Sequence, residues 1–318
     1  MSNARKLADN LPINGVANAE NILINGNFSV SQRGNYSSAT AISTSTYYLD
    51  RWKSDISGVS ATIQNPSVDL PNGVTTKSAK IAATSSGTGY LQLHQWIDPQ
   101  PYMDNRQITI SAYVRSNNAN TRIRVEKTGG NVDGSNTHSG GGGWELLEET
   151  ITLPDSLSSF RIGVIMWNGN AVSISNGDYI EMAEFKAEFG SRRTPFEHEP
   201  YETTLRKCQR YFYTVKGPSN GKHIGSVVMR DNTYFYGYPR SFPTPMRAAP
   251  SFTYSGVRVY VGDHTNGFTT LTLAAAETDA FSFNGSAAGA VTAAEAGHTG
   301  LLYMDATSSN HVTFDAEL

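Results

Sequence analysis

The sequence has a single cysteine, Cys208, in 318 residues. One thiol cannot form a disulfide within the chain, nor can it build a cysteine-rich zinc site. Charge is also scarce, because only 17% of the residues are charged and the formal net charge is −3. That is too little charge, and of the wrong sign, for a protein that neutralises nucleic-acid phosphates. We therefore expect no nucleic-acid partner.

Long apolar runs are missing as well. No window approaches the roughly 20 apolar residues that a transmembrane helix needs, so we expect no membrane insertion. The segment Met1 to Leu11 is polar and charged and holds no apolar run of the signal-peptide kind. We expect synthesis in a cytoplasm and departure by a route other than secretion.

Catalytic motifs are equally absent. No GxSxG elbow occurs, and no two histidines have the i, i+4 spacing of a zinc protease. The run Gly140 to Gly143 lacks the Lys-Ser/Thr that follows in a phosphate-binding loop. Cys208 and His198 do not make a convincing thiol nucleophile, because the cysteine falls on an apolar helical face. We predict no enzyme, no catalytic residue and no cofactor.

What the sequence does contain is typical of β-structure. There are 29 glycines and 16 tyrosines, and Asn-Gly recurs at 14, 25, 72, 168, 176, 220, 266 and 284. This dipeptide favours tight hairpin turns. Apolar residues alternate with polar ones in several segments, as at Ile108, Ile110 and Ala112, which suits a two-sheet sandwich. Phe160 to Met166 continues the alternation, and Ala183, Phe185, Ala187 and Phe189 are expected to end it on one face.

The chain divides into four parts. Residues 1–20 form an N-terminal extension, 21–190 a β-sandwich, 191–212 a linker with a short helix, and 213–318 a second β-domain. The glycine-rich tract 129–143 is expected to be a flexible loop. Between 201 and 212, Leu205, Cys208 and Phe212 follow the i, i+3, i+7 spacing of one helical face.

Five short motifs stand in a fixed order. They are Asn25-Gly-Asn-Phe-Ser-Val-Ser-Gln-Arg-Gly34, Tyr47-Tyr-Leu-Asp-Arg-Trp52, Arg193-Thr-Pro-Phe-Glu197, Cys208-Gln-Arg-Tyr-Phe212 and Phe242-Pro-Thr-Pro-Met-Arg-Ala-Ala-Pro250. Together they resemble a family of bacteriophage and prophage tail-fibre proteins, over roughly residues 20 to 255. The resemblance implies an all-β fold with an N-terminal jelly-roll carbohydrate-binding-like domain, a short linking helix and a C-terminal β-domain. It also implies a structural role for Trp52. The residues themselves predict structural roles for Phe196, an apolar anchor between two prolines, and for Cys208 and Phe212 on the inner face of the helix.

Three further expectations come from this resemblance. The first is a homotrimer located in the virion. The second is attachment to other virion proteins through residues 1–20. The third concerns calcium, which related modules hold with an acidic residue after the NGxF motif and an aspartate on the last strand. Here Ser29 follows the NGxF motif in place of an acidic residue, and the last strand reads Glu181-Met-Ala-Glu-Phe185 without an aspartate. We therefore predict no bound metal ion.

The clearest candidate for binding is the segment Tyr90 to Trp96. Alternation sends Leu91 and Leu93 to the core and the other side chains to the opposite face. Sugars stack on aromatic rings while amides and imidazoles bond their hydroxyls. The candidate carbohydrate-binding residues are Tyr90, Gln92, His94 and Trp96, with Trp144 added from the glycine-rich loop. The same face could instead be covered by a neighbouring subunit or by the loop near Trp144.

Three functions remain open from the sequence. The first is a virion protein of the tail-fibre type that recognises a host-surface glycan. The second is a purely structural connector or decoration protein of the virion. The third is a polysaccharide depolymerase, which would need two carboxylates in one groove. Should Trp96 prove structural, the contact with the host is expected at Tyr234 to Tyr238 instead.

Overall fold

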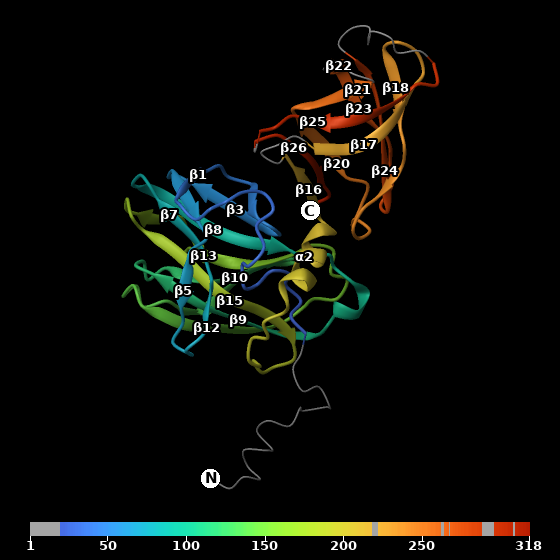
Figure 1. Cartoon of the computed structure of the whole chain (residues 1–318). Coiled ribbons are helices and arrows are strands. Elements are labelled where there is room, and N and C mark those ends of the chain that lie inside the picture. The colour runs from blue at the N-terminus through green and yellow to red at the C-terminus, as the bar shows by residue number, and fades with distance from the viewer. Residues whose placement is uncertain (1–19, 218–221, 262–263, 267, 288–295, 308) are drawn as a thin grey trace. The chain divides into compact units, whose positions relative to one another are not determined.

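The computed structural model describes residues 20–217, 222–261, 264–266, 268–287, 296–307 and 309–318. The chain forms two compact units, unit 1 up to Thr204 together with Leu318, and unit 2 from Leu205 to Glu317. Antiparallel strands dominate both units, which confirms the predicted all-β class (Figure 1). The proposed attachment segment 1–20 lies, apart from its last residue, outside the described residues.

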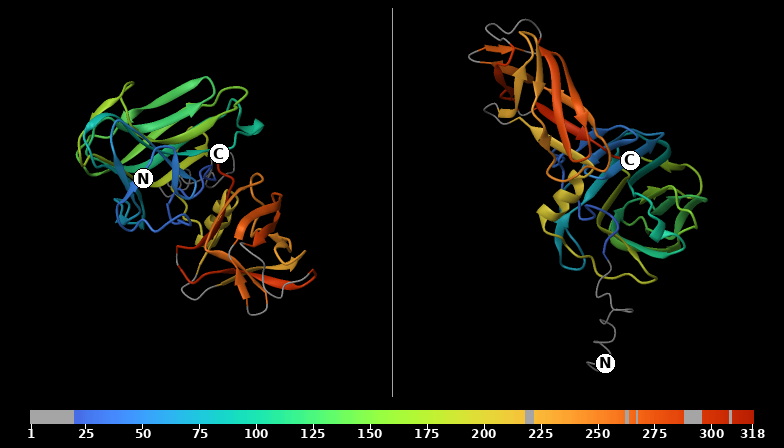
Figure 2. Two further views of the ribbon diagram at one scale, coloured as in Figure 1. Left: turned by 90° about the horizontal axis from the view of Figure 1, so that it is seen from above. Right: turned by 90° about the vertical axis from the view of Figure 1, so that its right-hand side faces the viewer.

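Unit 1 is the expected jelly-roll β-sandwich, with two antiparallel sheets as its layers (Figure 2). Sheet one contains, in spatial order, β1 (Thr40–Ile42), β4 (Ala61–Gln64), β7 (Ala79–Ala83), β15 (Tyr179–Phe189), β9 (Gln107–Ser116) and β12 (Trp144–Thr152). Sheet two contains β11 (Gly130–Thr137), β10 (Thr121–Lys127), β13 (Phe160–Met166), β8 (Gly87–Trp96), β3 (Trp52–Ser57) and β2 (Thr46–Leu49), with β14 (Val172–Ile174) paired to β8. A hairpin of β5 (Ser67–Asp69) and β6 (Thr75–Lys77) and a 3₁₀ turn η1 (Pro101–Met103) complete the unit.

The core of unit 1 lies between the two sheets. Period-two alternation puts Ile108, Ile110 and Ala112 of β9 on the inner face, where each is fully buried, as predicted. Leu91 and Leu93 of β8 meet them from sheet two. Burial of these apolar faces against each other is the main stabilising contribution to the unit.

One strand breaks the simple alternation. The pairing of β15 with β9 shifts between Ala183 and Lys186, and Glu184 between them has a positive φ of 47°. This bulge puts Ala183 opposite Tyr113, whereas Ala187 is opposite Ile110 on the core side. The prediction that Ala183 shares a face with Phe185 and Ala187 is therefore wrong, because a bulge inserts a residue that alternation does not count.

Two of the sequence motifs are joined in the core. Trp52 is fully buried, and its indole N–H donates to the carbonyl of Asn25 at 3.0 Å. The Asn25 amide in turn donates to the carbonyl oxygens of Val30 (2.9 Å) and Asp50 (3.1 Å). The Trp52 ring stacks on Phe185 at a centroid distance of 5.3 Å. The structural role expected of Trp52 is thus visible as packing and hydrogen bonding.

Only some of the Asn-Gly dipeptides lie in turns. Gly73, Gly169 and Gly177 have positive φ in turns, but Asn284 and Gly285 lie inside a strand and pair with a neighbouring strand. The predicted flexible loop at 129–143 is also wrong in its first half. Residues Gly130–Thr137 form β11, the edge strand of sheet two, which pairs with β10.

The link between the units contains the predicted helix. It is α2 (Tyr201–Gln209), and Cys208 is fully buried in it. Phe212 is also buried, with 6% exposed, but it opens strand β16 and is not part of the helix. The helix therefore ends at Gln209, before Phe212, the last residue of the apolar spacing.

Unit 2 contains two further sheets. The smaller one has β16 (Phe212–Lys216), β26 (His311–Asp315) and β20 (Ser251–Ser255). The larger one runs β19 (Arg240–Ser241), β24 (Ala280–Ala287), β18 (Tyr234–Gly237), β17 (Lys222–Met229), β25 (Thr299–Met304), β21 (Val257–Val261) and β22 (His264–Asn266), with β23 (Phe268–Ala276) paired to β24. Phe235, Phe283 and Phe314 lie in its core. The MRAAP motif contributes buried Met246 and partly buried Arg247, and the Nε of Arg247 donates to the Ala316 carbonyl at 3.0 Å.

Candidate functional site

The four predicted residues of β8 share the outer face of sheet two. Tyr90 and Trp96 are partly exposed, whereas Gln92 and His94 are only 2% and 0% exposed. Side chains from the flanking strands β3 and β13, and from β10 beyond β13, contact the two polar residues. The structure thus brings Tyr90, Gln92, His94 and Trp96 together as the alternation predicted, and it embeds the middle two in a polar network.

Arg161 is the centre of that network. It stands on β13 directly opposite Trp96 of β8, and its guanidinium carbon lies 5.0 Å from the centre of the Trp96 ring. Its Nη1 donates to Asp55 Oδ2 at 3.0 Å and to His94 Nε2 at 3.2 Å. Its Nη2 donates to the carboxylate of Glu126. One cation therefore fixes two carboxylates, an imidazole and an indole.

Glu126 extends the network across β10. Gln92 Nε2 donates to its Oε1 at 3.0 Å, and Arg124 Nε lies 3.2 Å from the same oxygen. Arg124 also pairs with Asp133 at 3.2 Å. Although burial acts to raise the pKa of Glu126, hydrogen bonds from Arg161 and Gln92 outweigh it and the pKa is lowered. A carboxylate held ionised in this way is a poor general acid.

His94 is held in its neutral form. Burial, and then the positive charge of Arg161, lower the pKa of His94 to about 3. Because Arg161 donates to Nε2, the ring proton belongs on Nδ1, which lies 3.9 Å from Asp55 Oδ2. Gly163 makes room for this ring from β13, since a Cβ there would lie 2.5 Å from the His94 Cβ. The imidazole is a fixed, uncharged part of the face.

Two aromatic platforms mark the ends of this face. Trp96 is at one end of β8. Near the other end, Tyr90 meets Trp167 edge-on at a centroid distance of 6.0 Å. Arg124 lies 5.3 Å from the Trp167 ring centre. At about 3.3 Å per residue, the six-residue step from Tyr90 to Trp96 spans roughly 20 Å. We call this surface the β8 face and define it by Tyr90, Trp96, Arg124, Arg161 and Trp167.

Trp167 and Arg161 were not among the predicted site residues. The signal was present, because Phe160, Ile162, Val164 and Met166 point inward and therefore send Arg161 and Trp167 outward. What the sequence could not supply is which strand lies beside β8. The pairing of β13 with β8 joins residues 65 or more positions apart.

Trp144 is not part of the β8 face. It opens β12 in sheet one, opposite Arg115 of β9, whose guanidinium carbon lies 5.0 Å from its ring centre. Arg115 Nε donates to buried Glu181 at 3.1 Å, and Ser78 donates to the same carboxylate at 2.7 Å. The structure therefore places Trp144 on the outer face of the other sheet. Glu181, one of the two positions considered for calcium, already has these two donors.

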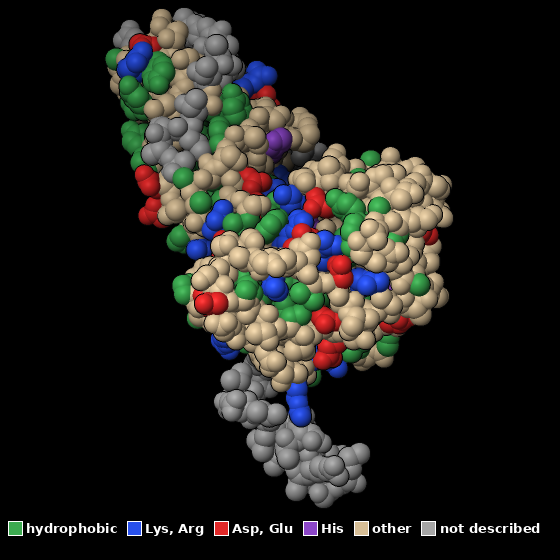
Figure 3. Space-filling view, turned by 180° about the vertical axis from the view of Figure 1, so that it is seen from behind, with side chains coloured by type: hydrophobic (Ala, Val, Ile, Leu, Met, Phe, Trp, Pro, Cys, Tyr) green, Lys and Arg blue, Asp and Glu red, His purple; other side chains and the backbone are tan. Residues whose placement is uncertain are grey.

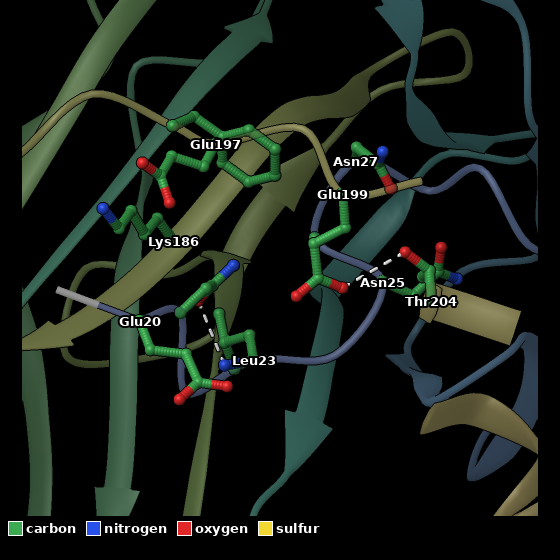
Figure 4. Close-up of a pocket in the computed structure, with 11 residues that line it drawn as sticks. Glu20, Leu23, Asn25, Asn27, Lys186, Glu197, Glu199 and Thr204 are labelled. Atoms are coloured by element: carbon green, nitrogen blue, oxygen red, sulfur yellow. Dashed lines mark hydrogen bonds between the residues drawn. The ribbon is translucent and has the colours of Figure 1, made fainter. Parts of the chain in front are cut away.

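A cavity of about 150 Å³ lies elsewhere in unit 1, between the Asn25–Asn27 loop and the linker (Figure 4). Phe196 is partly buried and lines it, together with Glu197, Glu199 and Lys186. Lys186 Nζ donates to the Pro195 carbonyl at 3.0 Å, and Thr204 donates to Glu199 at 3.3 Å. Small-molecule pockets usually enclose about 300–1,000 Å³, so the cavity is too small for an oligosaccharide. The polar lining here serves to hold the linker on the sandwich.

Charges of both signs are mixed on the surface. Lysine, arginine, aspartate and glutamate side chains lie interspersed on the face in Figure 3. No group of three or more described His, Cys, Asp or Glu side chains could hold a metal ion. In the described part of the chain, no helix has both the length and the apolar character needed to cross a membrane.

No protein-family model matches the chain, and a search of curated proteins finds no match. Among solved structures, the enzymatically active domain of bacteriophage CBA120 tailspike protein 4 is 14% identical, with a TM-score of 0.34. The match covers 54% of this chain and 21% of the tailspike chain. TmCBM61 in complex with β-1,4-galactotriose is 13% identical, with a TM-score of 0.34, and the match covers 54% of this chain and all of that one.

A third similar structure is the CBM22-1 xylan-binding domain from Paenibacillus barcinonensis Xyn10C. It is 11% identical, with a TM-score of 0.32, and the match covers 55% of this chain and 98% of that domain. These identities and TM-scores are too low to bear on what this chain binds, so the candidate site rests on its own geometry.

Proposed function

We propose that this protein is a phage virion component of the tail-fibre type, which recognises a host-surface glycan through the β8 face. The observation that carries the proposal is the pair of partly exposed aromatic platforms, Trp96 and Tyr90 with Trp167, on one rigid sheet. The five ordered sequence motifs support the assignment to a virion.

Rigidity is what makes this face suited to weak, hydroxyl-rich ligands. Arg161 holds Trp96 from one side and is itself held by Asp55 and Glu126. Side chains that are already fixed lose little conformational entropy on binding. A shallow site on one chain binds weakly, and several copies raise the effective concentration. Host adsorption by many weak contacts fits these properties.

We also propose that the β8 face binds without cleaving its ligand. Asp55 and Glu126 are both tied to Arg161, and the pKa of Glu126 is lowered. Glycoside hydrolysis by two carboxylates needs one of them to keep its proton near neutral pH. A depolymerase is the less favoured reading for this reason.

The test uses a glycan array and the full chain displayed in multivalent form. We expect binding to a subset of bacterial surface glycans, weakened at least tenfold by Trp96→Ala and by Trp167→Ala. The matched control is Trp144→Ala, which removes a partly exposed tryptophan from the outer face of the other sheet. It should bind as the unchanged protein does.

Particles give the second arm of the test. Virions that carry Trp96→Ala should adsorb to host cells more slowly while the isolated variant melts as the unchanged protein does. Normal adsorption by these virions would show that Trp96 is structural, and the contact with the host would then be expected at Tyr234 to Tyr238. Release of soluble fragments from an array glycan would instead establish a depolymerase.

A further inference from the structure

Unit 2 carries an aromatic surface that the β8 face does not explain. Strand β18 alternates buried Phe235 with Tyr234 and Tyr236 on its other side, and Tyr238 follows just after the strand. Tyr236 is 42% exposed and Tyr238 is 53% exposed. The Tyr234 and Tyr236 rings meet edge-on at a centroid distance of 5.5 Å. These are large rings on the solvent side of a strand whose opposite side fills the core.

The pairing extends this surface over neighbouring strands. Tyr236 is opposite Val228 of β17, and Thr299 of β25 follows in register. Tyr303 of β25 and Tyr260 of β21 point to the same side of the sheet as Tyr236, and both are partly exposed. We call this surface the tyrosine face; it consists of Tyr234, Tyr236, Tyr238, Tyr260 and Tyr303.

Hydroxyl and amide groups of β24 lie beside the rings of β18, and partly exposed Val228 and Leu301 lie opposite Tyr236 and Tyr260. Tyr236 is opposite Asn284 of β24, and Tyr234 is opposite Ser286. Tyrosine combined with serine and asparagine supplies rigid contact area with few rotatable bonds, and adaptable hydrogen bonding beside it. Phenol rings accept the C–H side of a sugar ring, while the small polar groups bond its hydroxyls.

Charge decides among the classes of occupant. Arg230 at the edge of the tyrosine face pairs with Asp231 at 2.9 Å and lies 4.2 Å from the Tyr234 ring centre. Arg258 pairs with Asp305 at 2.7 Å. These cations are compensated within the protein, which disfavours an anionic ligand. Asn284 and Ser286 beside the rings add the uncharged hydrogen-bonding groups that a hydroxyl-rich ligand needs.

We propose that the tyrosine face is a second binding site of this protein and that it takes a neutral polysaccharide. The site lies wholly in unit 2 and is independent of the β8 face. It gives each chain two separate ways to hold carbohydrate.

The experiment is gel electrophoresis of the full chain through galactomannan, hydroxyethylcellulose and dextran. The starting protein carries Trp96→Ala and Trp167→Ala, so that the β8 face no longer contributes. It should still be retarded in at least one of these gels. Adding Tyr236→Ala and Tyr238→Ala should lower its affinity at least tenfold, and Tyr238→Ala alone should lower it in part.

The matched control is Tyr254→Ala, an exposed tyrosine of β20 in the smaller sheet of unit 2. It should leave the retardation unchanged. All four tryptophans lie in unit 1, so the binding of these polysaccharides to the tyrosine face should leave tryptophan emission unaltered. Changed emission in the unsubstituted protein reports the β8 face, which separates the two sites.

Two results would overturn the proposal. One is absence of retardation in all three gels, or retardation that the tyrosine replacements do not affect. The other is a fall in light-scattering mass when Tyr236 and Tyr238 are replaced, because the face would then be a contact between copies of this chain.

Discussion

At the scale of single residues, His94 shows how the polar network around Arg161 constrains a buried side chain. Its ring is fully buried, and the groups that face it are Arg161, Asp55, Glu126 and Lys53. Burial and the adjacent Arg161 cation together oppose a positive charge on the ring more than the carboxylates favour it. The folded protein keeps His94 neutral, which links its stability to pH.

The pH dependence has a definite sign. An unfolded histidine has a pKa near 6.5, whereas that of folded His94 is about 3. Between these values the unfolded chain binds a proton that the folded chain does not, so this contribution is complete above about pH 6.5 and is lost as the pH falls. Relative to His94→Gln, the unchanged protein should lose up to roughly 1.4 kcal/mol per pH unit below that point.

Urea denaturation of both proteins at about pH 7.5 and about pH 5 measures this difference, since the other titrating groups are shared. His94→Gln keeps a side chain able to accept from Arg161. Parallel pH profiles for the two proteins would contradict the neutral assignment.

At the scale of elements, the close approach of strand β15 requires glycine at position 26. A Cβ at this position would lie 2.0 Å from the backbone oxygen of Phe185, and Phe185 N donates to the Gly26 carbonyl at 2.9 Å. Backbone cannot move aside as a flexible side chain could. Gly26→Ala should therefore destabilise unit 1 by about 1–3 kcal/mol, measured by urea denaturation.

Gly143→Ala is the control for that prediction, because a Cβ there would meet no atom within 4 Å. It should change stability by no more than about 0.5 kcal/mol. Equal effects of the two replacements would show that close packing against β15 is not what requires glycine at position 26.

Burial of Phe212 is expected to stabilise the first strand of unit 2. It is 6% exposed at the first position of β16 and opposite Asp315 of β26. Phe212→Ala should cost about 3–5 kcal/mol, because a buried ring is replaced by a cavity. Circular dichroism during urea denaturation measures the loss, with exposed Tyr238→Ala as a control for the unit. Unchanged stability combined with altered glycan binding would identify Phe212 as a site residue.

The elements also show how far the sequence alone could reach. Period-two alternation correctly placed Leu91 and Leu93 inside and Trp96 outside, since one strand's faces follow from local spacing. It failed at Ala183, where a bulge resets the register, and at Gly130–Thr137, where glycine suggested a loop. Alternation could not predict that Trp167 contacts Tyr90, or that Trp144 lies on the other sheet, because which strands are neighbours depends on long-range pairing.

At the scale of the whole molecule, the proposed virion role leads to a predicted assembly. We expect a homotrimer, as the family resemblance implies and as closed cyclic symmetry permits. Three copies would carry three β8 faces and three tyrosine faces, which raises the effective concentration of weak sites. Light scattering at micromolar concentration checks this; a mass near the 34.5 kDa of one chain would contradict it.

Arg51 carries a consequence for how such a protein could change hosts. It is buried in the Tyr47–Trp52 motif, and its guanidinium donates to the backbone carbonyl of Trp96. Through this hydrogen bond the motif holds the main chain of β8, and the bond does not involve the side chain at position 96. Outward residues such as Tyr90, Trp96 and Trp167 can therefore be replaced while the hydrogen bond from Arg51 to the backbone is kept. Recognition and architecture are separable here, and a library varied only at these three positions should yield folded proteins with new host preferences.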